Sequence, residues 1–392
     1  MFGEDWGNHP SSTQHLAKKF SETRKVLWIN SIGLRRPKLN INDSIRVISK
    51  LSKMIKREQC PKIEVPQNMS IFQAKALPFP GNSMARRINS FLLPNSINEF
   101  ARKQGIEKPV LWISLPSAVD AVGTLNEKLS IYYCGDDFSS LAGVDHDAIS
   151  RMEEELVGRV DLIFTASANL TKKFPSGKAH YLPHGVDYDL FHQKYERPFD
   201  LPTGKPIAGF YGSISDWIDV DLLEHTAKYL PDWNIVLIGE VKTNIQKLKK
   251  FENVIFLGRK NHIELPAYVQ NWQVSLLPFK RNQQIEFCNP LKLREYLAVG
   301  RPIVSTDIPV VGEYKDHVYV CGNGDDFSHK ILEASFDGAK SNNNIWRMFN
   351  NWEGIEALQL NQLGRKLSVK DESWSNRANE VLNKLSKTAT TS

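Results

Sequence analysis

The 392-residue sequence has little cysteine and no long apolar run. Its four cysteines, Cys60, Cys134, Cys288 and Cys321, are scattered, without the paired spacing of a zinc site or the density of a disulfide framework. No stretch approaches the roughly 18–20 apolar residues that cross a bilayer, and the first residues lack the organisation of a signal peptide. These absences predict reduced thiols and a cytoplasmic protein, either free or peripheral at the inner face of the plasma membrane.

Several catalytic motifs are missing as well. The chain has no GxxxxGK[ST] loop, no GxGxxG fingerprint and no GxSxG elbow. This disfavours NTPases, dinucleotide-dependent oxidoreductases and α/β-hydrolases. No metal site is expected, because no CxxC or Cys/His ligand spacing occurs and the adjacent Asp136 and Asp137 do not form a DxD motif. No motif for nucleic-acid recognition accompanies the basic residues.

Positive charge is concentrated at the front of the chain. Residues 1–110 hold 19 Lys and Arg against 8 Asp and Glu, a net charge of +11, which leaves −5 for the remainder. Apolar residues interleave with these runs, a pattern that suits attachment to anionic lipid head groups; a solvated helix face is the alternative. The runs are Lys18-Lys19, Arg35-Arg36, Lys50 to Arg57, Arg86-Arg87 and Arg102-Lys103.

The length and the 41% apolar content suit two domains, each with its own core. Apolar strands alternate with helical patterns in both halves, which predicts two Rossmann-like, doubly wound parallel α/β domains. Expected strands include 26–29, 110–114, 129–134, 161–165, 179–183, 207–211, 233–238, 254–257, 274–277, 302–305 and 318–320. Expected helices include 43–57, 83–104, 145–159 and 219–230. The predicted domains are 1–190 and 207–372, with a linker at 191–206 and a terminal helix and tail at 373–392.

The most informative segment runs from Asn289 to Thr306. Asn-Pro is a turn signal that opens a helix, Gly300 can end the helix at φ > 0, and Pro302-Ile-Val-Ser-Thr306 leads into a buried strand. Lys292 and Glu295 lie three residues apart on one helical face. A cation beside exposed N–H groups suits a diphosphate, and a carboxylate one turn later suits ribose hydroxyls. The plainer interpretation is an ordinary αβ unit with a surface ion pair.

This segment, NPLKLREYLAVGRPIVST, resembles the sugar-nucleotide signature of GT-B glycosyltransferases, in particular the family-four-like (group 1) enzymes of bacterial surface-polysaccharide pathways. Tyr181 to Asp187, Gly209 to Ser213 and Leu257-Gly-Arg259 agree with it in order and spacing. The sequence departs from the family where its Glu-x7-Glu pair would place a Glu, because position 287 is Phe. The basic pair of the first C-domain loop is also missing from residues 213–217.

The resemblance implies a C-terminal crossover helix and a donor site on the C-terminal domain, with Lys292 at the diphosphate and Glu295 at the ribose. Lys292 would also act in catalysis by stabilising the charge that grows on the leaving diphosphate. Such enzymes generally need no metal and no cofactor, and their donor substrate is a UDP- or GDP-sugar. The residues expected to bind the donor are Gly212, Ser213, Gly239, Arg259, Lys260, Asn289, Leu291, Lys292 and Glu295.

On the N-terminal domain, Asp136 and Asp137 follow a predicted strand. Either could act as general base on an acceptor hydroxyl, with Asp137 favoured, or could cap the following turn. His184, in the segment His-Gly-Val-Asp, could contact the donor sugar or only tolerate an unusual backbone angle beside Gly185. The entry segment with His9 and the Arg35-Arg36 pair could form the acceptor side.

The sequence therefore predicts a glycosyltransferase that moves a sugar from a nucleoside-diphosphate sugar to a saccharide or lipid-linked saccharide in cell-surface or exopolysaccharide biosynthesis. Retention and inversion of the sugar's configuration both remain open. The alternatives are a GT-B sugar-nucleotide epimerase or hydrolase, and a non-catalytic subunit that binds the nucleotide sugar for a membrane glycosyltransferase complex.

Overall fold

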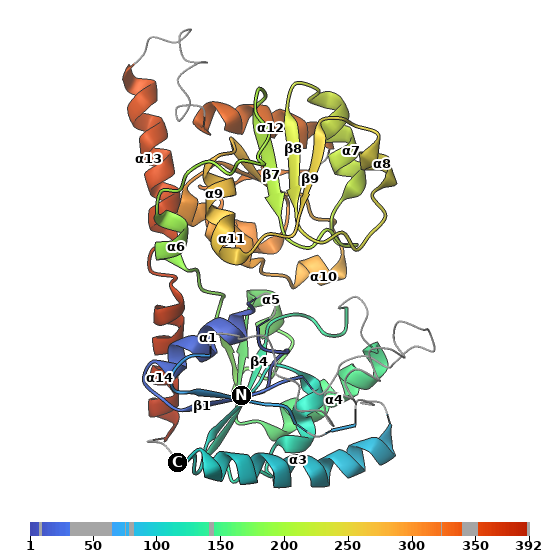
Figure 1. The fold of residues 1–392 in the computed structure, drawn as a ribbon, viewed down its shortest axis with the longest axis vertical. Helices are drawn as coiled ribbons and strands as arrows, with labels where there is room; N and C mark the ends of the chain where they lie inside the picture. The colour runs from blue at the N-terminus through green and yellow to red at the C-terminus, as the bar shows by residue number, and fades with distance from the viewer. Residues whose placement is uncertain are drawn as a thin grey trace. The chain divides into compact units, whose positions relative to one another are not determined.

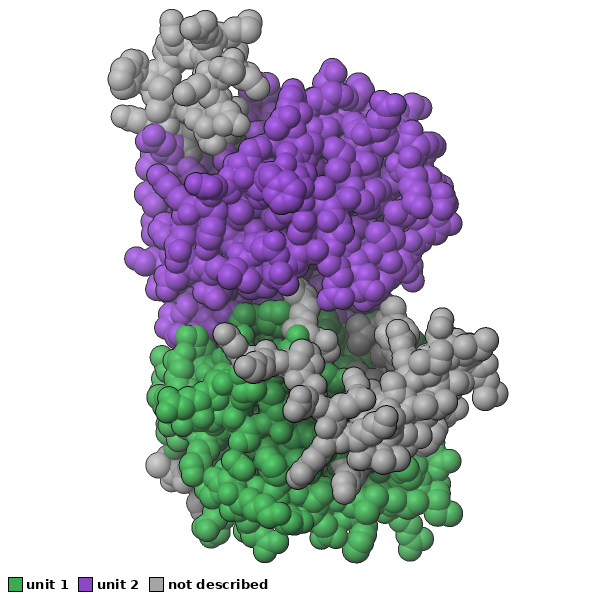
Figure 2. Space-filling view, in the orientation of Figure 1, with its two compact units in different colours: residues 1–183, 378–392 green, residues 184–377 purple. Residues whose placement is uncertain are grey.

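The computed structural model describes residues 1–7, 10–31, 65–74, 76–77, 82–140, 145–322, 324–338 and 352–389. The chain divides into two compact units, coloured separately in Figure 2: unit 1 is Met1–Pro183 with Ala378–Ser392, and unit 2 is His184–Arg377. Each unit is built from parallel strands and helices, as the alternating pattern predicts (Figure 1). The helix expected over 43–57 lies outside the described residues.

The strands of unit 1 are joined through Phe2. This residue bridges Ile29 and Ile113, and its N–H donates to the Trp112 carbonyl at 2.8 Å. The sequence signals only the strands with continuous apolar runs, so both β2 and the bridging Phe2 were not anticipated. Strands β1 (Val26–Ile29) and β2 (Met69–Phe72) form one parallel pair, and β3 (Val110–Ile113), β4 (Leu129–Cys134), β5 (Leu162–Thr165) and β6 (Ala179–Tyr181) pair in that order.

The helices of unit 1 begin at polar caps. Asn82 accepts a hydrogen bond from the Ala85 N–H at 3.0 Å, and Asp145 caps the helix that follows it in the same way. Helix α3 buries one side chain per turn against the sheet, including Leu93 and Ile97. The elements are α1 (Ser12–Ser21), α3 (Ser83–Lys103), η1 (Pro116–Ala121), α4 (His146–Arg159) and α5 (Ala168–Thr171).

Unit 2 contains a parallel sheet in the order β12-β11-β10-β7-β8-β9. The chain starts in the middle at β7, winds outward through β8 and β9, and then returns to the other side of β7 at β10. Ligands of such sheets bind outside the carboxyl ends of the strands, where this reversal occurs. The strands are β7 (Ile207–Tyr211), β8 (Asn234–Ile238), β9 (Val254–Gly258), β10 (Val274–Leu277), β11 (Ile303–Thr306) and β12 (Tyr319–Cys321).

Helix α11 (Leu291–Val299) is the buried helix expected after Asn289-Pro290, and it ends where predicted because Gly300 takes φ +86°. Its apolar residues Leu293, Tyr296 and Leu297 are fully buried. The other helices of unit 2 are α6 (Tyr188–His192), α7 (Val220–Tyr229), α8 (Gln246–Lys249), η2 (His262–Glu264), α9 (Leu265–Gln270), α10 (Gln283–Glu286), η3 (Pro309–Tyr314), α12 (Gly324–Gly338) and α13 (Trp352–Ser368).

The last helix, α14 (Trp374–Ala389), begins in unit 2, and its residues from Ala378 onward are grouped with unit 1. Of the expected linker, 191–206, the first two residues end α6 and residues 193–206 pack within unit 2. Leu201 is buried, and the Tyr195 N–H donates to the Gln270 side chain at 3.1 Å. These contacts tie the segment to α9, so it is part of the unit 2 framework.

Candidate donor site at the carboxyl edge of unit 2

Two glycines bring the loops after β7 and β8 unusually close. Gly239 has φ +149°, and a Cβ there would lie 1.9 Å from the Gly212 carbonyl oxygen. Gly212 has φ +135°, and its N–H donates to the Ile238 carbonyl at 2.8 Å. A side chain at Gly239 would force the loops apart. Ser213 follows, with its hydroxyl 2.7 Å from that of Ser215.

Lys292 projects from the first turn of α11 towards the loop after β7. Its ammonium lies 4.5 Å from the centre of the Phe210 ring and 5.4 Å from that of Phe279, at the ends of β7 and β10. A Cβ on Gly212 would come within 2.4 Å of this ammonium. Desolvation lowers the pKa of Lys292 to about 8, with opposing contributions from Cys288 and Glu295. The surface ion pair with Glu295 does not form, and no carboxylate among the described residues pairs with Lys292.

The N-terminus of α11 is open. Pro290 occupies the cap position, where it has no side chain that could accept a capping hydrogen bond. The amide groups of a first helical turn, beginning here at Leu291, favour a negative charge in front of them. An uncapped helix start beside a half-buried lysine is therefore an arrangement suited to a phosphate group.

The expected ligand Asn289 instead holds the turn in place. It is buried, and its side-chain oxygen accepts a hydrogen bond from Arg294 at 2.6 Å. Arg294 also donates to Glu372 at 2.7 Å, and Glu372 accepts further bonds from Arg377 and from the Tyr314 hydroxyl, each at 2.7 Å. Burial alone would raise the pKa of Glu372, but these neighbours bring it below its ordinary value. The network fixes the turn from which Lys292 projects.

Glu295 lies on the same helix and makes two contacts that the sequence did not indicate. The Tyr211 hydroxyl donates to one carboxylate oxygen, and Nε2 of His262 lies 2.6 Å from the other. Burial, and then the charge of Glu295, raise the pKa of Tyr211 well above its ordinary value. Glu295 is therefore held between β7 and η2. His262 was not predicted as a site residue. The only hint of it in the sequence is its position three residues after Arg259.

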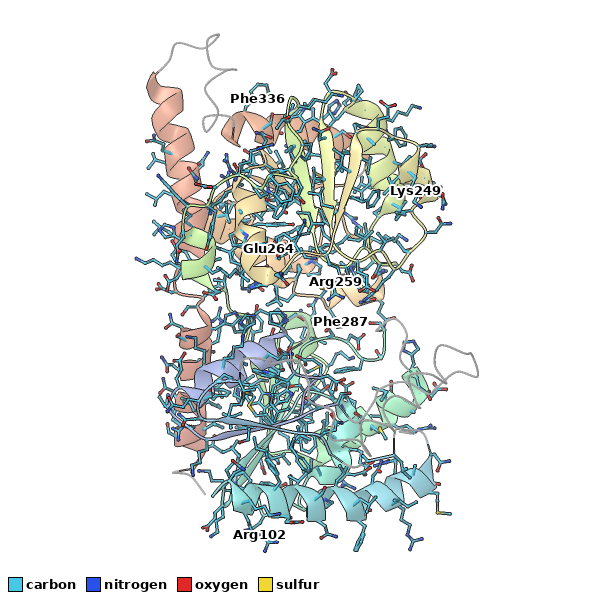
Figure 3. The ribbon with its side chains drawn as sticks, viewed as in Figure 1. Arg102, Lys249, Arg259, Glu264, Phe287 and Phe336 are labelled. Atoms are coloured by element: carbon cyan, nitrogen blue, oxygen red, sulfur yellow. The ribbon has the colours of Figure 1, made fainter. Side chains whose placement is uncertain are left out.

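The two basic residues after β9 have different surroundings. Arg259 is mostly exposed at the carboxyl end of β9, 3.8 Å from the Glu240 carboxylate (Figure 3). Lys260 turns away and donates to Asp200 at 2.6 Å, with its ammonium 5.5 Å from the centre of the Tyr268 ring. Arg259 thus stays available to a ligand, whereas Lys260 fastens the segment 193–206 to α9.

A shallow pocket of about 460 Å³ lies beside this edge, in the stretch that leads from β10 to α11. Five of its seven lining residues are polar or charged, and the guanidinium of Arg281 is 3.0 Å from the carboxylate of Asp307. Planar amides, carboxylates and a guanidinium can hydrogen-bond several hydroxyl groups at once. The lining residues are Arg281, Asn282, Gln283, Ile285, Glu286, Asp307 and Pro309.

In unit 1, the two candidate bases after β4 differ. The Asp137 side chain is fully buried and accepts hydrogen bonds from Lys173, from Ser139 at 2.7 Å and from Ser140 at 2.8 Å. Burial alone would raise the pKa of Asp137. The hydrogen bonds from these donors outweigh burial and bring the pKa below its ordinary value. The Asp136 side chain reaches solvent, yet desolvation by surrounding protein and the charge of Asp137 raise its pKa to about 6. These contacts favour a structural role for Asp137 and shift our expectation of the base to Asp136.

His184 is buried at the start of unit 2, and its carbonyl accepts a hydrogen bond from Arg377 at 3.4 Å. The next residue, Gly185, has no room for a Cβ, because the Trp374 ring would lie 2.8 Å away. His184 is therefore part of the junction with α14 and belongs to a different unit from Asp136. His9 and the Arg35-Arg36 pair lie outside the described residues.

In the part of the chain that the structure describes, no group of three or more His, Cys, Asp or Glu residues is placed to hold a metal ion. Within that same part, no helix has the length and apolarity needed to cross a membrane. Cys134, Cys288 and Cys321 are free thiols.

Part of the chain is similar in sequence to known glycosyltransferases. Residues 205–336 match the family model described as glycosyl transferases group 1. TuaH of Bacillus subtilis (strain 168), a glycosyltransferase by name assigned to teichuronic acid biosynthesis, is 28% identical over 241 residues. That alignment covers 56% of this chain and spans only 61% of the length of the relative.

Solved structures show the same fold over nearly the whole chain. A sucrose-phosphate synthase from Thermosynechococcus elongatus has a TM-score of 0.66 at 14% identity, covering 97% of this chain and 93% of its own. HepE of Anabaena, solved with UDP and glucose, has a TM-score of 0.65 at 10% identity, covering 98% of both chains. The predicted fold is confirmed: the chain has the GT-B fold, and its residues 205–336 are similar to the group 1 glycosyltransferases.

Proposed function

We propose that this chain transfers a sugar from a nucleoside-diphosphate sugar to a saccharide acceptor during assembly of a cell-surface polysaccharide. The observation that carries the proposal is the position of Lys292, half-buried over Phe210 and Phe279 and against Gly212, beside the uncapped start of α11. A lysine held out of water without an acidic partner is costly for an isolated protein, and an incoming anion relieves that cost.

The chemistry follows from the charge at this site. At neutral pH a lysine with a pKa near 8 is still mostly protonated, so Lys292 can meet a diphosphate as a cation. Cleavage of the sugar–phosphate bond increases the negative charge on the departing diphosphate. Lys292 and the amides of α11 are preorganised to stabilise that charge in a site of low polarity. No metal is required for this stabilisation in the proposed mechanism.

The donor class is supported by two further features. Arg259 at the end of β9 and Glu295 near the start of α11 flank the crevice in which a nucleoside would lie. HepE, which shares the fold, is titled as binding UDP and glucose, and TuaH is named for biosynthesis of a cell-surface polymer. We take UDP- or GDP-sugars as donors and a saccharide or lipid-linked saccharide as acceptor. The polar pocket between β10 and α11 is the proposed place for sugar hydroxyls.

For the acceptor side we propose Asp136 as general base. Its carboxylate is accessible, and a pKa of about 6 leaves it ionised at neutral pH yet basic enough to take a proton from a hydroxyl as the bond forms. A base in this role implies inversion of the sugar's configuration. We also propose a peripheral location at the inner face of the plasma membrane, where lipid-linked acceptors lie.

The test is release of nucleoside diphosphate from UDP- and GDP-sugars in the presence and absence of membrane extract. A transferase gives acceptor-dependent release, a hydrolase releases the nucleotide with water alone, and a binding subunit releases none. Lys292→Ala and Glu295→Ala should each lower the acceptor-dependent rate at least tenfold, about 1.4 kcal/mol of transition-state stabilisation. Lys249→Ala, at an exposed position on α8, is the matched control and should keep the rate. Unchanged rates in both site variants would remove the assignment.

A further inference from the structure

Helix α3 (Ser83–Lys103) has two faces of different character. Its inner face repeats every four residues and is buried against the rest of unit 1. Asn89 on this face bonds both the N–H and the carbonyl of Leu77, at 2.7 and 3.0 Å. This is the ordinary pattern of a helix that covers a sheet. The inner residues are Ala85, Asn89, Leu93, Ile97 and Ala101.

The opposite face is apolar where a surface helix is normally polar. Met84 is 67% exposed and Phe91 is 70% exposed, and they lie seven residues apart, about two helical turns. Ile88 and Leu92, each 40% exposed, fill the space between and beside them. Single exposed apolar residues need no explanation, but four adjacent ones on one helix face mark an interaction surface. We define Met84, Ile88, Phe91 and Leu92 as the outer patch of α3.

Basic residues flank the outer patch. Arg87 is exposed within it, and Arg102 stands eighteen residues after Met84, about five turns, so both point in the same direction. Arg102 extends away from the rest of unit 1 in Figure 3. Lys25 adds a further charge at the C-terminal end of α3, where its ammonium donates to the Gln104 carbonyl at 3.1 Å. Glu99, the one acidic residue in the sequence of α3, is paired with Lys103 at 2.6 Å.

We propose that the outer patch of α3 and its flanking basic residues form a docking surface for an anionic lipid bilayer. The helix would lie in the plane of the membrane, with Met84 and Phe91 among the acyl chains. Arg87 and Arg102 would reach lipid phosphates. The inference deepens the proposed function, on which it rests, because it assigns to specific residues the place where the enzyme meets its lipid-linked acceptor.

The combination of charge and side-chain type favours lipid over a protein partner. Long arginine and lysine side chains can cover apolar surface while their charges stay in the head-group layer. Each basic residue near an anionic surface adds to the attraction, which falls with ionic strength because salt screens it. A specific protein partner would instead be expected to meet polar groups of both signs around the patch. Around the outer patch the net charge is positive.

The experiment is sedimentation of the full chain with vesicles of phosphatidylcholine alone or mixed with phosphatidylglycerol. Wild type should bind the mixed vesicles at low salt, bind the neutral ones at least tenfold more weakly, and lose affinity as salt rises. Met84→Glu combined with Phe91→Glu should lower binding to the mixed vesicles at least tenfold. Phe336→Glu is the matched control: Phe336 is 58% exposed on α12 of unit 2, so its replacement should leave vesicle binding unchanged.

A second pair of variants separates charge from apolar contact. Arg87→Gln with Arg102→Gln should weaken binding to the mixed vesicles and flatten its salt dependence, while weak binding to neutral vesicles persists. All variants alter exposed positions, and thermal unfolding with and without nucleoside diphosphate checks that each folds and keeps its donor site.

The outcomes are distinct. The lipid proposal is wrong if wild type binds both kinds of vesicle equally, or if the Met84/Phe91 variant binds like the Phe336 control. It is also wrong if that variant instead converts a dimer to a monomer with vesicle binding unchanged, because the patch is then an interface between copies. Loss of vesicle binding only in the patch variants, in a protein that ignores every nucleotide sugar, would support the docking surface and refute the proposed function.

Discussion

Replacing Lys292 with Met should make the protein more stable and abolish its binding of nucleoside diphosphate. Desolvation lowers the pKa of Lys292 from 10.5 to about 8, and a shift of that size corresponds to about 3 kcal/mol of unfavourable free energy. Lys292 is only half-buried, so solvent screening reduces this figure. Loss of the contacts with Phe210 and Phe279 costs about 1 kcal/mol. The net expectation for Lys292→Met is a gain of about 1–2 kcal/mol at pH 7.

The gain has a defined pH dependence. The folded-state pKa lies below the unfolded one, so between pH 8 and pH 10.5 the unfolded chain of the wild type binds more protons. Below pH 8 the wild type carries the full free-energy cost of a charged, desolvated Lys292, and the variant is the more stable. As the pH rises from about 8 towards 10.5 the wild type regains stability and the advantage of Lys292→Met disappears.

The assay is thermal unfolding across this pH range, with and without nucleoside diphosphate. At pH 7 the midpoint of unit 2 should rise by roughly 2–8 °C, since 1 kcal/mol moves a domain of this size by about 2–4 °C. Nucleoside diphosphate should raise the midpoint of the wild type and leave that of the variant unchanged. Lys249→Met, at an exposed site on α8 labelled in Figure 3, should change stability by no more than about 0.5 kcal/mol. A destabilised variant, or one that keeps full nucleotide affinity, refutes the reasoning.

Three further predictions follow from the same contacts. Gly239→Ala places a Cβ 1.9 Å from the Gly212 carbonyl oxygen at a positive φ, so unfolding by urea should show a loss of at least ~2 kcal/mol. Arg294→Met leaves the Glu372 carboxylate without a main partner and should lower the free energy of unfolding by about 3 kcal/mol in the same assay at pH 7. This destabilisation should fade as pH falls below 4.5, where Glu372 is protonated in the unfolded chain. Asp136→Asn should abolish acceptor-dependent turnover, and the wild-type kcat/KM should fall on the acid side of about pH 6.

Two of these predictions have a matched control. Gly177→Ala adds a Cβ in open space and should leave unfolding by urea unchanged, which separates collision from the general effect of adding a methyl group. Asp137→Asn should lower stability through loss of the Lys173 contact while retaining more turnover than Asp136→Asn. Equal turnover in the two Asp variants would argue against Asp136 as the base.

Much of the fold was accessible from the sequence because local signals agreed. Five of the strands in unit 1 and those of unit 2 are apolar runs, and the helix after Asn289-Pro290 begins and ends at its turn and at Gly300. Phe2 was missed because a single bridging residue leaves no periodic pattern. Strand β2 was missed as well, because Ser70 interrupts its short apolar run, Met-Ser-Ile-Phe.

The site was predictable only in part, because its chemistry depends on contacts between distant segments. Lys292 and Glu295 follow from the motif, but their partners Phe210, Tyr211 and His262 come from other elements. Lys260 looked as suitable as Arg259 until its contact with a carboxylate sixty residues away was seen.

Asp137 and Asn289 show the same limit. Both are polar residues at the ends of elements, where binding and structural roles have the same sequence signature. Their surroundings, a buried ion pair with Lys173 and a hydrogen bond from Arg294, distinguish the two roles.

The most direct test of the account is a crystal structure of the protein with a bound nucleoside diphosphate. The account predicts the diphosphate at the start of α11, with phosphate oxygens within hydrogen-bond reach of the Lys292 ammonium and of the first α11 amides, and with the backbone of Gly212 against it. A nucleotide bound elsewhere on unit 2, with Lys292 still stacked on Phe210 and contacting no phosphate, would contradict it.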